Sequence, residues 1–250
     1  MIAALQEALA RPGLGWIVAA VLLAGIVRGF AGFGTALILI PVAARVVPPH
    51  WTLILLAVTD SIGPLPNLPR ALRDGAPREV VTLVAGMLAG LPLGLWVLAA
   101  LPVETFRWVA SIVALVMLAL LMSGWRWHGA HGGPVSVAAG GVSGFLGGST
   151  GMAGPPVILY YMVQDMPVAK LRANLLLFFV GSNAALMGYL ALAGRLELPA
   201  VMLGLALAPV FLAANVVGAA LFRPHMGTLY RRVAYALVAG AALSGLPIWG

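Results

Sequence analysis

Residues 141–156 read Gly-Val-Ser-Gly-Phe-Leu-Gly-Gly-Ser-Thr-Gly-Met-Ala-Gly-Pro-Pro, an apolar stretch interrupted by glycines and closed by two prolines. Residues 25–35 read Gly-Ile-Val-Arg-Gly-Phe-Ala-Gly-Phe-Gly-Thr, and this stretch continues to Pro41. The two Gly-Phe-x-Gly cores start 115 residues apart (144 − 29), as do Pro41 and Pro156. Glycine clusters and proline interrupt a helix, and in a membrane such backbone survives only inside protein or beside a wet cavity. Two breaks in corresponding positions predict the central site of a transporter.

The composition indicates a membrane protein. Hydrophobic residues make up 62% of the 250 residues, charged residues make up 8%, and the mean hydropathy is +1.05. Soluble domains carry about 25% charged residues, so no soluble class fits. Spans of about 20 residues leave room for about eight crossings. The formal charge of +7 comes from basic residues near segment ends, which indicates topology signals and lipid contact rather than nucleic acid binding.

The apolar segments predict an all-α polytopic membrane protein with about eight transmembrane helices in two homologous four-segment halves. Residues 16–47 as one helix would measure about 48 Å against an apolar core of about 30 Å, so the glycines are expected to divide the first helix of each half. Glycines within one segment recur every four residues and predict close helix packing: Gly86, Gly90 and Gly94. The expected segments are 16–47, 51–62, 80–101, 108–123, 135–161, 171–192, 201–222 and 233–245.

The predicted division of the chain is residues 1–124 for the first repeat, 125–134 for a linker and 135–250 for the second repeat. Residues 1–11 lack the features of a signal peptide and predict a short interfacial helix. The distribution of basic residues does not choose between inverted and parallel copies, so both arrangements stay open.

The two breaks are predicted to form an anion site. The N-terminal ends of half-helices carry a partial positive charge and free N–H groups. The downstream half-helices are expected to begin near Thr35 and near Ser149–Thr150, whose hydroxyls can bond an oxyanion. Arg28 lies deep in apolar sequence, which makes it a candidate for the substrate path. The predicted substrate-binding residues are Arg28, Gly32, Phe33, Gly34, Thr35, Asn67, Gly147, Gly148, Ser149, Thr150, Gly151 and Asn183.

Several other roles keep two interpretations. Asp60 is a carboxylate inside an apolar run, and we expect it to pair with Arg28, with a proton relay as the alternative. Asn67 and Asn183 are near-symmetric amides that serve either as hydrogen bonds between helices or as pore lining. Arg172 either anchors the chain at the interface or forms an access site for substrate with a neighbouring asparagine.

The sequence argues against an enzyme. Gly141-Val-Ser143-Gly144 spells the Gly-x-Ser-Gly found in rhomboid-type intramembrane proteases, but a serine nucleophile needs a base such as histidine. All the histidines lie outside the predicted spans. The absence of cysteine excludes disulfides and iron–sulfur ligation, no buried cluster of ligands suits a metal, and no phosphate-binding loop is present. We therefore expect no catalytic residues, no metal and no cofactor.

With its paired breaks, trailing prolines and four-plus-four layout, the chain resembles the TauE/SafE sulfite exporter family. The resemblance lies in Gly29-Phe-Ala-Gly-Phe-Gly34 with Pro41, and in Gly141-Val-Ser-Gly-Phe-Leu-Gly-Gly148 with Pro155-Pro156. It implies a bacterial inner-membrane permease that exports small sulfur-containing anions such as sulfite, sulfonates or sulfoacetate. The family commonly carries a run of glycines where this chain has Gly148-Ser149-Thr150-Gly151, a departure that bears on substrate choice.

We therefore expect a multi-pass secondary transporter of small sulfur-containing or organic anions, which binds its substrate between the two halves and alternates by rocking them. Protons and sodium are the candidate coupling ions, the bilayer is a partner, and a homodimer is a candidate assembly. Two other interpretations stay open. A non-transporting subunit of a larger complex would hold the breaks apart, or dry and filled by Phe30 and Phe145, whereas a passive anion channel would have a continuous pore.

Overall fold

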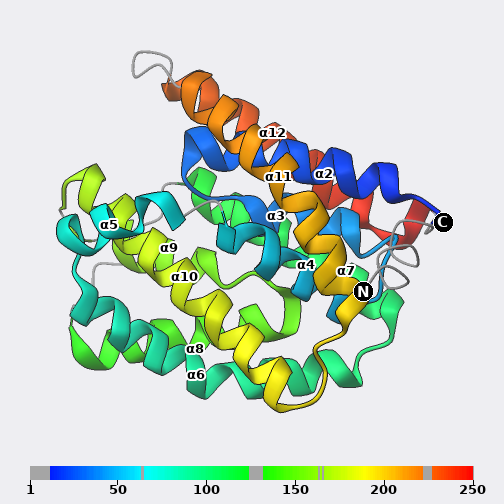
Figure 1. Cartoon of the computed structure of the whole chain (residues 1–250), viewed down its shortest axis with the longest axis horizontal. Coiled ribbons are helices and arrows are strands. Elements are labelled where there is room, and N and C mark those ends of the chain that lie inside the picture. The colour runs from blue at the N-terminus through cyan, green and yellow to red at the C-terminus, as the bar shows by residue number, and fades with distance from the viewer. Residues whose placement is uncertain are drawn as a thin grey trace.

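The computed structural model describes residues 12–62, 65–123, 132–162, 164, 166–221 and 227–249. The predicted interfacial helix at 1–11 and most of the predicted linker lie outside these residues. The described residues are mainly helical and contain no β-strand (Figure 1). Their α-helices are α2 (Leu14–Ala31), α3 (Thr35–Ala43), α4 (Pro49–Ile62), α5 (Leu68–Asp74), α6 (Pro77–Ala100), α7 (Val103–Ser123), α8 (Gly133–Thr150), α9 (Gly154–Met162), α10 (Val168–Leu192), α11 (Leu198–Leu221) and α12 (Gly227–Gly245), with 3-10 helices at Leu65–Asn67 and Pro247–Trp249.

Five of the described helices are long and apolar enough to span a membrane, namely α2, α6, α7, α10 and α11. Large apolar side chains are exposed on their outer faces, as on α6, where Val81, Leu88, Leu93 and Trp96 are each more than half exposed. An exterior of this kind suits lipid rather than water. The helices therefore agree with the multi-pass membrane protein that the composition predicts.

Two shorter helices, α3 and α4, fill the interior. Nearly every residue of α3 is buried, and α4 is buried without interruption from Trp51 to Asp60. A helix that is apolar on all sides belongs in the core of a protein. In Figure 1, α3 and α4 lie between α2, α11 and α12 on one side and α6 and α8 on the other.

Both glycine-rich stretches break a helix, as predicted, and they do so with similar backbone. Gly32 ends α2 at φ 81°, and its N–H donates to the carbonyl of Arg28. Gly151 ends α8 at φ 77°, and its N–H donates to the carbonyl of Gly147. Positive φ at the residue after a helix is a common way to stop it and favours glycine. A short linker then leads into α3 after the first break and into α9 after the second.

The second break differs from the prediction in one respect, because its downstream half-helix begins at Gly154 rather than near Ser149–Thr150. Ser149 and Thr150 are the last residues of α8, and their hydroxyls donate to the carbonyls of Phe145 and Leu146 at 2.7 Å and 2.8 Å. Gly147–Gly151 is therefore the C-terminal end of a helix. The prediction that it is a half-helix N-terminus was wrong, because the left-handed glycine follows the hydroxyls rather than preceding them.

Glycines bring the helices into close pairs, α2 with α11 and α6 with α8. A Cβ atom at Gly29 would lie 2.2 Å from the carbonyl oxygen of Asn215, and one at Gly148 would lie 2.6 Å from that of Leu91. The packing predicted for α6 is confirmed, since Cβ atoms at its glycines would lie within 2.2 Å of α8 carbonyl oxygens: Gly86, Gly90 and Gly94. Small residues permit this approach of two backbones.

The ends of the broken helices lie 119 residues apart rather than 115. Gly151 follows Gly32 by 119 residues (151 − 32), and the start of α9 follows the start of α3 by the same interval (154 − 35). The difference of four residues is about one helical turn. Because glycines recur at four-residue intervals in both stretches, the sequence pattern also matches itself one turn out of register.

Candidate functional site

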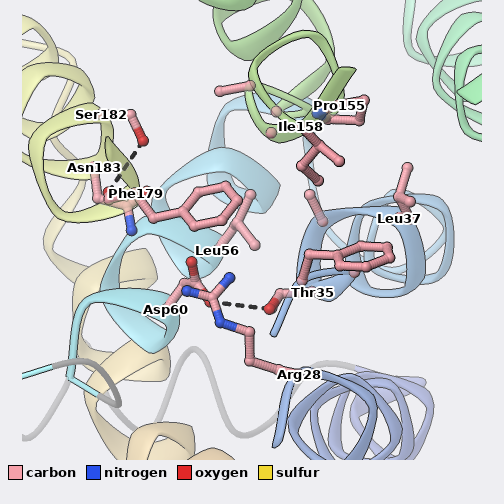
Figure 2. Close-up of a pocket in the computed structure, with 16 residues that line it drawn as sticks. Arg28, Thr35, Leu37, Leu56, Asp60, Pro155, Ile158, Phe179, Ser182 and Asn183 are labelled. Carbon is pink, nitrogen blue, oxygen red and sulfur yellow. Dashed lines mark hydrogen bonds and ion pairs between the residues drawn. The ribbon is translucent and has the colours of Figure 1, made fainter. Parts of the chain in front are cut away.

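Three side chains meet where α2 ends, α3 begins and α4 approaches its end. Arg28 lies in the last turn of α2, Thr35 is the first residue of α3, and Asp60 lies near the end of α4. Arg28 Nη1 lies 3.4 Å from Asp60 Oδ1, and the Thr35 hydroxyl donates to the same oxygen at 2.9 Å (Figure 2). All three residues are buried, with exposed fractions of 8%, 2% and 4%. The structure thus contains the Arg28–Asp60 pair that the sequence predicts.

Helix α10 completes the surroundings of this pair. The Arg28 guanidinium lies over the ring of Phe179, 4.5 Å from its centroid, where the ring face attracts the cation. One helical turn further along α10, the side-chain nitrogen of Asn183 is buried beside the Asp60 side chain, and it makes no hydrogen bond of good geometry among the described residues. A buried donor without an acceptor is costly. It therefore marks a place where an acceptor from outside the protein would bind well.

A small cavity of about 40 Å³, which we call the inner cavity, lies between these side chains and the two breaks. Gly34 and Thr35 line it from the first break, and Gly151 and Gly154 line it from the second. The two breaks are therefore brought together at one polar cavity. Its free volume is enough for a few water molecules, since one needs about 10–15 Å³.

A larger cavity of about 400 Å³, which we call the vestibule, lies on the other side of Arg28. Arg28 lines both cavities, so the inner cavity and the vestibule adjoin at this residue. The vestibule wall carries three arginines and one aspartate, together with Asn67 and Asn215: Arg28, Arg70, Arg172 and Asp74. Its lining is therefore net positive, which favours the approach of an anion.

The predicted site residues fall into three groups. Those that line the inner cavity are Arg28, Phe33, Gly34, Thr35, Gly151 and Asn183. Gly32 and Asn67 line the vestibule, so the two asparagines that look symmetric in sequence lie in different cavities. The remaining four line neither cavity and belong to the C-terminal part of α8: Gly147, Gly148, Ser149 and Thr150.

Three residues that line the inner cavity are not among the predicted binding residues: Asp60, Phe179 and Ser182. Asp60 is recognisable in the sequence as a lone carboxylate in an apolar run, but the sequence predicts it as the partner of Arg28 rather than as a binding residue. Phe179 and Ser182 are not recognisable in this way, because an aromatic residue and a serine on an apolar helix are common. The hydroxyl of Ser143, in the protease-like motif, donates a hydrogen bond to the carbonyl of Ala153. Among the described residues, no group of three or more His, Cys, Asp or Glu could hold a metal ion.

The comparisons with known proteins agree with this architecture. The sequence model of the family described as Sulfite exporter TauE/SafE matches residues 17–245, nearly the whole chain. Neither the curated proteins nor the solved structures contain a significant match.

Proposed function

The chain belongs to the TauE/SafE sulfite exporter family, and we propose that it is a secondary transporter that binds a small sulfur-containing or organic oxyanion at Arg28, beside the inner cavity. Sulfite and sulfonates are the first candidates, export is the proposed direction, and a bacterial inner membrane is the proposed location. The family and the apolar helices support a membrane transporter of this kind. The site itself is inferred from geometry.

The observation that carries the proposal is the way Asp60 is held. One carboxylate oxygen forms the ion pair with the Arg28 guanidinium and also accepts a hydrogen bond from the Thr35 hydroxyl. A carboxylate, a sulfite and a sulfonate all present oxygens that accept hydrogen bonds and carry negative charge. Arginine binds such groups with two donors at once. Asp60 therefore occupies, from inside the protein, the place that a substrate oxyanion would take.

The start of α3 adds to this site. Its N-cap residue, Gly34, has no side chain that could bond the first N–H groups of the helix. These groups and the helix dipole favour a nearby anion. The unpaired Asn183 nitrogen supplies a further donor at the same cavity.

We further propose that the eight-segment, two-half layout holds and that the halves rock around this site. The pairing of helices supports it, because α2 packs on α11 of the other half and α6 packs on α8 of the other half. Two copies related by a two-fold axis exchange such pairs. The meeting of both breaks at one polar cavity favours a transporter over a non-transporting subunit.

The test is uptake into proteoliposomes of labelled sulfite, sulfoacetate, taurine, sulfate and acetate. Saturable uptake of a sulfur oxyanion is expected, whereas a passive channel would give uptake that scarcely saturates. Arg28→Ala should reduce uptake by about 30-fold or more, because removal of one partner from a buried pair of charged groups costs about 2–5 kcal/mol. Arg195→Ala is the matched control, since Arg195 is exposed and lines neither cavity. Uptake unchanged by Arg28→Ala, or failure with every anion, would overturn the proposal.

A further inference from the structure

We propose that Asp60 couples anion binding to the uptake of one proton. An anion that takes the Arg28 guanidinium displaces the Asp60 carboxylate, and the displaced carboxylate binds a proton to become a neutral carboxyl group. This inference rests on the proposed function, because it requires an anion at Arg28. It adds the identity of the coupling ion, its binding residue and a ratio of one proton for each anion.

The charge balance of the inner cavity is the first argument. Among the described residues that line it, Arg28 and Asp60 carry the only charges, and they compensate each other. An added anion would leave this buried region with a net negative charge. An uncompensated buried charge is strongly unfavourable, and a buried group neutralises rather than stay charged without a partner. Protonation of Asp60 restores neutrality with the anion bound.

The groups around Asp60 can form hydrogen bonds with both its ionised and its protonated form. With Asp60 ionised, its Oδ1 atom pairs with the Arg28 guanidinium and accepts a hydrogen bond from the Thr35 hydroxyl. With Asp60 protonated, its O–H becomes a donor, and the Thr35 hydroxyl can accept that bond or turn to donate to the anion, since a hydroxyl does both. The Asn183 nitrogen, which lies beside Asp60 without a well-formed hydrogen bond, can donate to the anion. Phe179 holds the Arg28 guanidinium in place while its partner changes.

A proton needs one titratable group at the cavity, whereas a metal cation such as sodium would also need oxygen ligands from backbone carbonyls or hydroxyls. A bound cation needs several oxygen ligands, as in calcium and magnesium sites. Asp60 is the only carboxylate in the lining of the inner cavity among the described residues, and no cluster of three or more acidic or His residues occurs in that part of the chain. A proton needs only the carboxylate.

Few other titratable groups face this part of α4. The neighbouring helix α2 contributes Arg28, the described parts of α3 and α11 contribute no charged residue, and α10 carries its charges, Lys170 and Arg172, in its first turns. At the far end of α4, His50 pairs with Glu197 at 2.6 Å. His50 precedes Asp60 by ten residues, about 15 Å along the helix, so it needs a control.

The direct test measures proton uptake on anion binding by calorimetry of the full-length protein in detergent, in buffers of different ionisation enthalpy, with isethionate as the probe. This monovalent sulfonate stays ionised across pH 6–8, so any proton taken up belongs to the protein. Wild type should take up about one proton per anion, and its affinity should fall by up to about tenfold for each rise of one pH unit. Asp60→Asn imitates the neutral carboxyl group and should bind with no proton uptake and no pH dependence. His50→Gln should behave as wild type.

Flux measurements provide the second readout. Movement of one proton with a monovalent anion carries no net charge, so isethionate flux through wild type should not respond to membrane potential, whereas flux through Asp60→Asn should. Where Asp60→Asn fails to fold, the wild-type proton count still decides, and Asp60→Glu should retain one proton. Failure of wild type to bind any tested anion would overturn the proposed function. Anion binding without proton uptake, flux that requires sodium, or full proton uptake by Asp60→Asn would overturn the coupling alone.

Discussion

The two helix breaks have the same backbone conformation but different side chains. Gly32 and Gly151 have nearly the same φ angle and end their helices in the same way, and the next helix begins at the third residue after each. At the position of Arg28 in the first break, the second break has Gly147 (28 + 119). The first break therefore carries the charge, and the second carries none. If the two breaks belong to the duplicated halves that we propose, the difference teaches that the backbone of a break can be repeated while the charged side chain occurs once.

The same contrast extends to the helices opposite the breaks. With the offset of 119 residues, Pro48 corresponds to Pro167 and Asp60 corresponds to Phe179. Arg28 contacts both members of the last pair, the carboxylate by charge and the ring by its face. Helices α2 and α4 therefore supply the ion pair, and α10 supplies an aromatic surface. A second arginine at Gly147 would place two like charges near one buried cavity, which is unfavourable.

The downstream helices differ as well. Helix α3 starts Thr-Ala-Leu after a capping glycine, so its first N–H groups are present. Helix α9 starts Gly-Pro-Pro, and Pro155 and Pro156 have no N–H. The first break is thus the better end for an anion. The second contributes shape rather than donors.

The largest effect should come from the shared scaffold. Gly29→Ala and Gly148→Ala each place a Cβ atom against the backbone of a neighbouring helix, at 2.2 Å and 2.6 Å. Each should destabilise the protein by about 1–3 kcal/mol, the usual result of overpacking. Thermal unfolding in detergent measures this effect. Gly188→Ala is the control, since its Cβ atom would meet nothing within 4 Å, and it should be neutral or stabilising by up to about 1 kcal/mol. A tolerated substitution at one site only would break the structural equivalence of the two helix pairs.

The close helix pairs and the two helix breaks could be predicted because they depend on short, local sequence patterns. Glycines at four-residue intervals on α6 predict close packing, and glycine clusters in 25–35 and 141–156 predict breaks. The register was harder to predict, since a repeating glycine pattern fits at two offsets that differ by one turn. Only the left-handed backbone of Gly151 decides where α8 ends, and φ is not visible in the sequence. The roles of Phe179 and Asn183 depend on where α10 packs, which is a long-range property.

The next largest effect should be a difference in anion uptake between variants that lack the hydroxyl of the first break and variants that lack a hydroxyl of the second. Thr35→Val removes the hydroxyl that bonds Asp60 in this structure and that is proposed to bond the anion or the protonated Asp60 when the anion is bound. A hydrogen bond to a charged group is an interaction of about 1.5–3 kcal/mol. The substitution should reduce anion uptake by about 10-fold to 100-fold. Thr150→Val removes a bond to the carbonyl of its own helix and should leave uptake within about twofold of wild type. Initial rates in proteoliposomes, corrected for the amount of protein inserted, test the pair. Equal losses would show that both breaks contribute hydroxyls to the site.

A smaller difference is expected between the two left-handed glycines. Gly32→Ala and Gly151→Ala both force a side chain into a conformation that costs about 1–2 kcal/mol. A Cβ atom at Gly32 meets nothing within 4 Å, whereas one at Gly151 would lie 2.6 Å from Ile40 Cδ1. Gly151→Ala should therefore lower the unfolding temperature more than Gly32→Ala. Gly32→Asn should recover part of the loss, because asparagine tolerates this conformation better than alanine. The reverse order would mean that the second break relaxes more easily than the first.

The smallest effect distinguishes the two asparagines. Asn183 is buried at the inner cavity with an unpaired nitrogen, whereas Asn67 is exposed at the vestibule. Asn183→Ala should weaken anion binding by about fivefold to tenfold, which corresponds to one hydrogen bond of about 1 kcal/mol, and should leave maximal flux less affected. Asn67→Ala should change binding less than twofold, because water replaces an exposed amide at little cost. Concentration dependence of uptake measures both. A larger loss at Asn67 would move the binding position into the vestibule, and Arg28, which lines both cavities, would then bind the anion from its outer side.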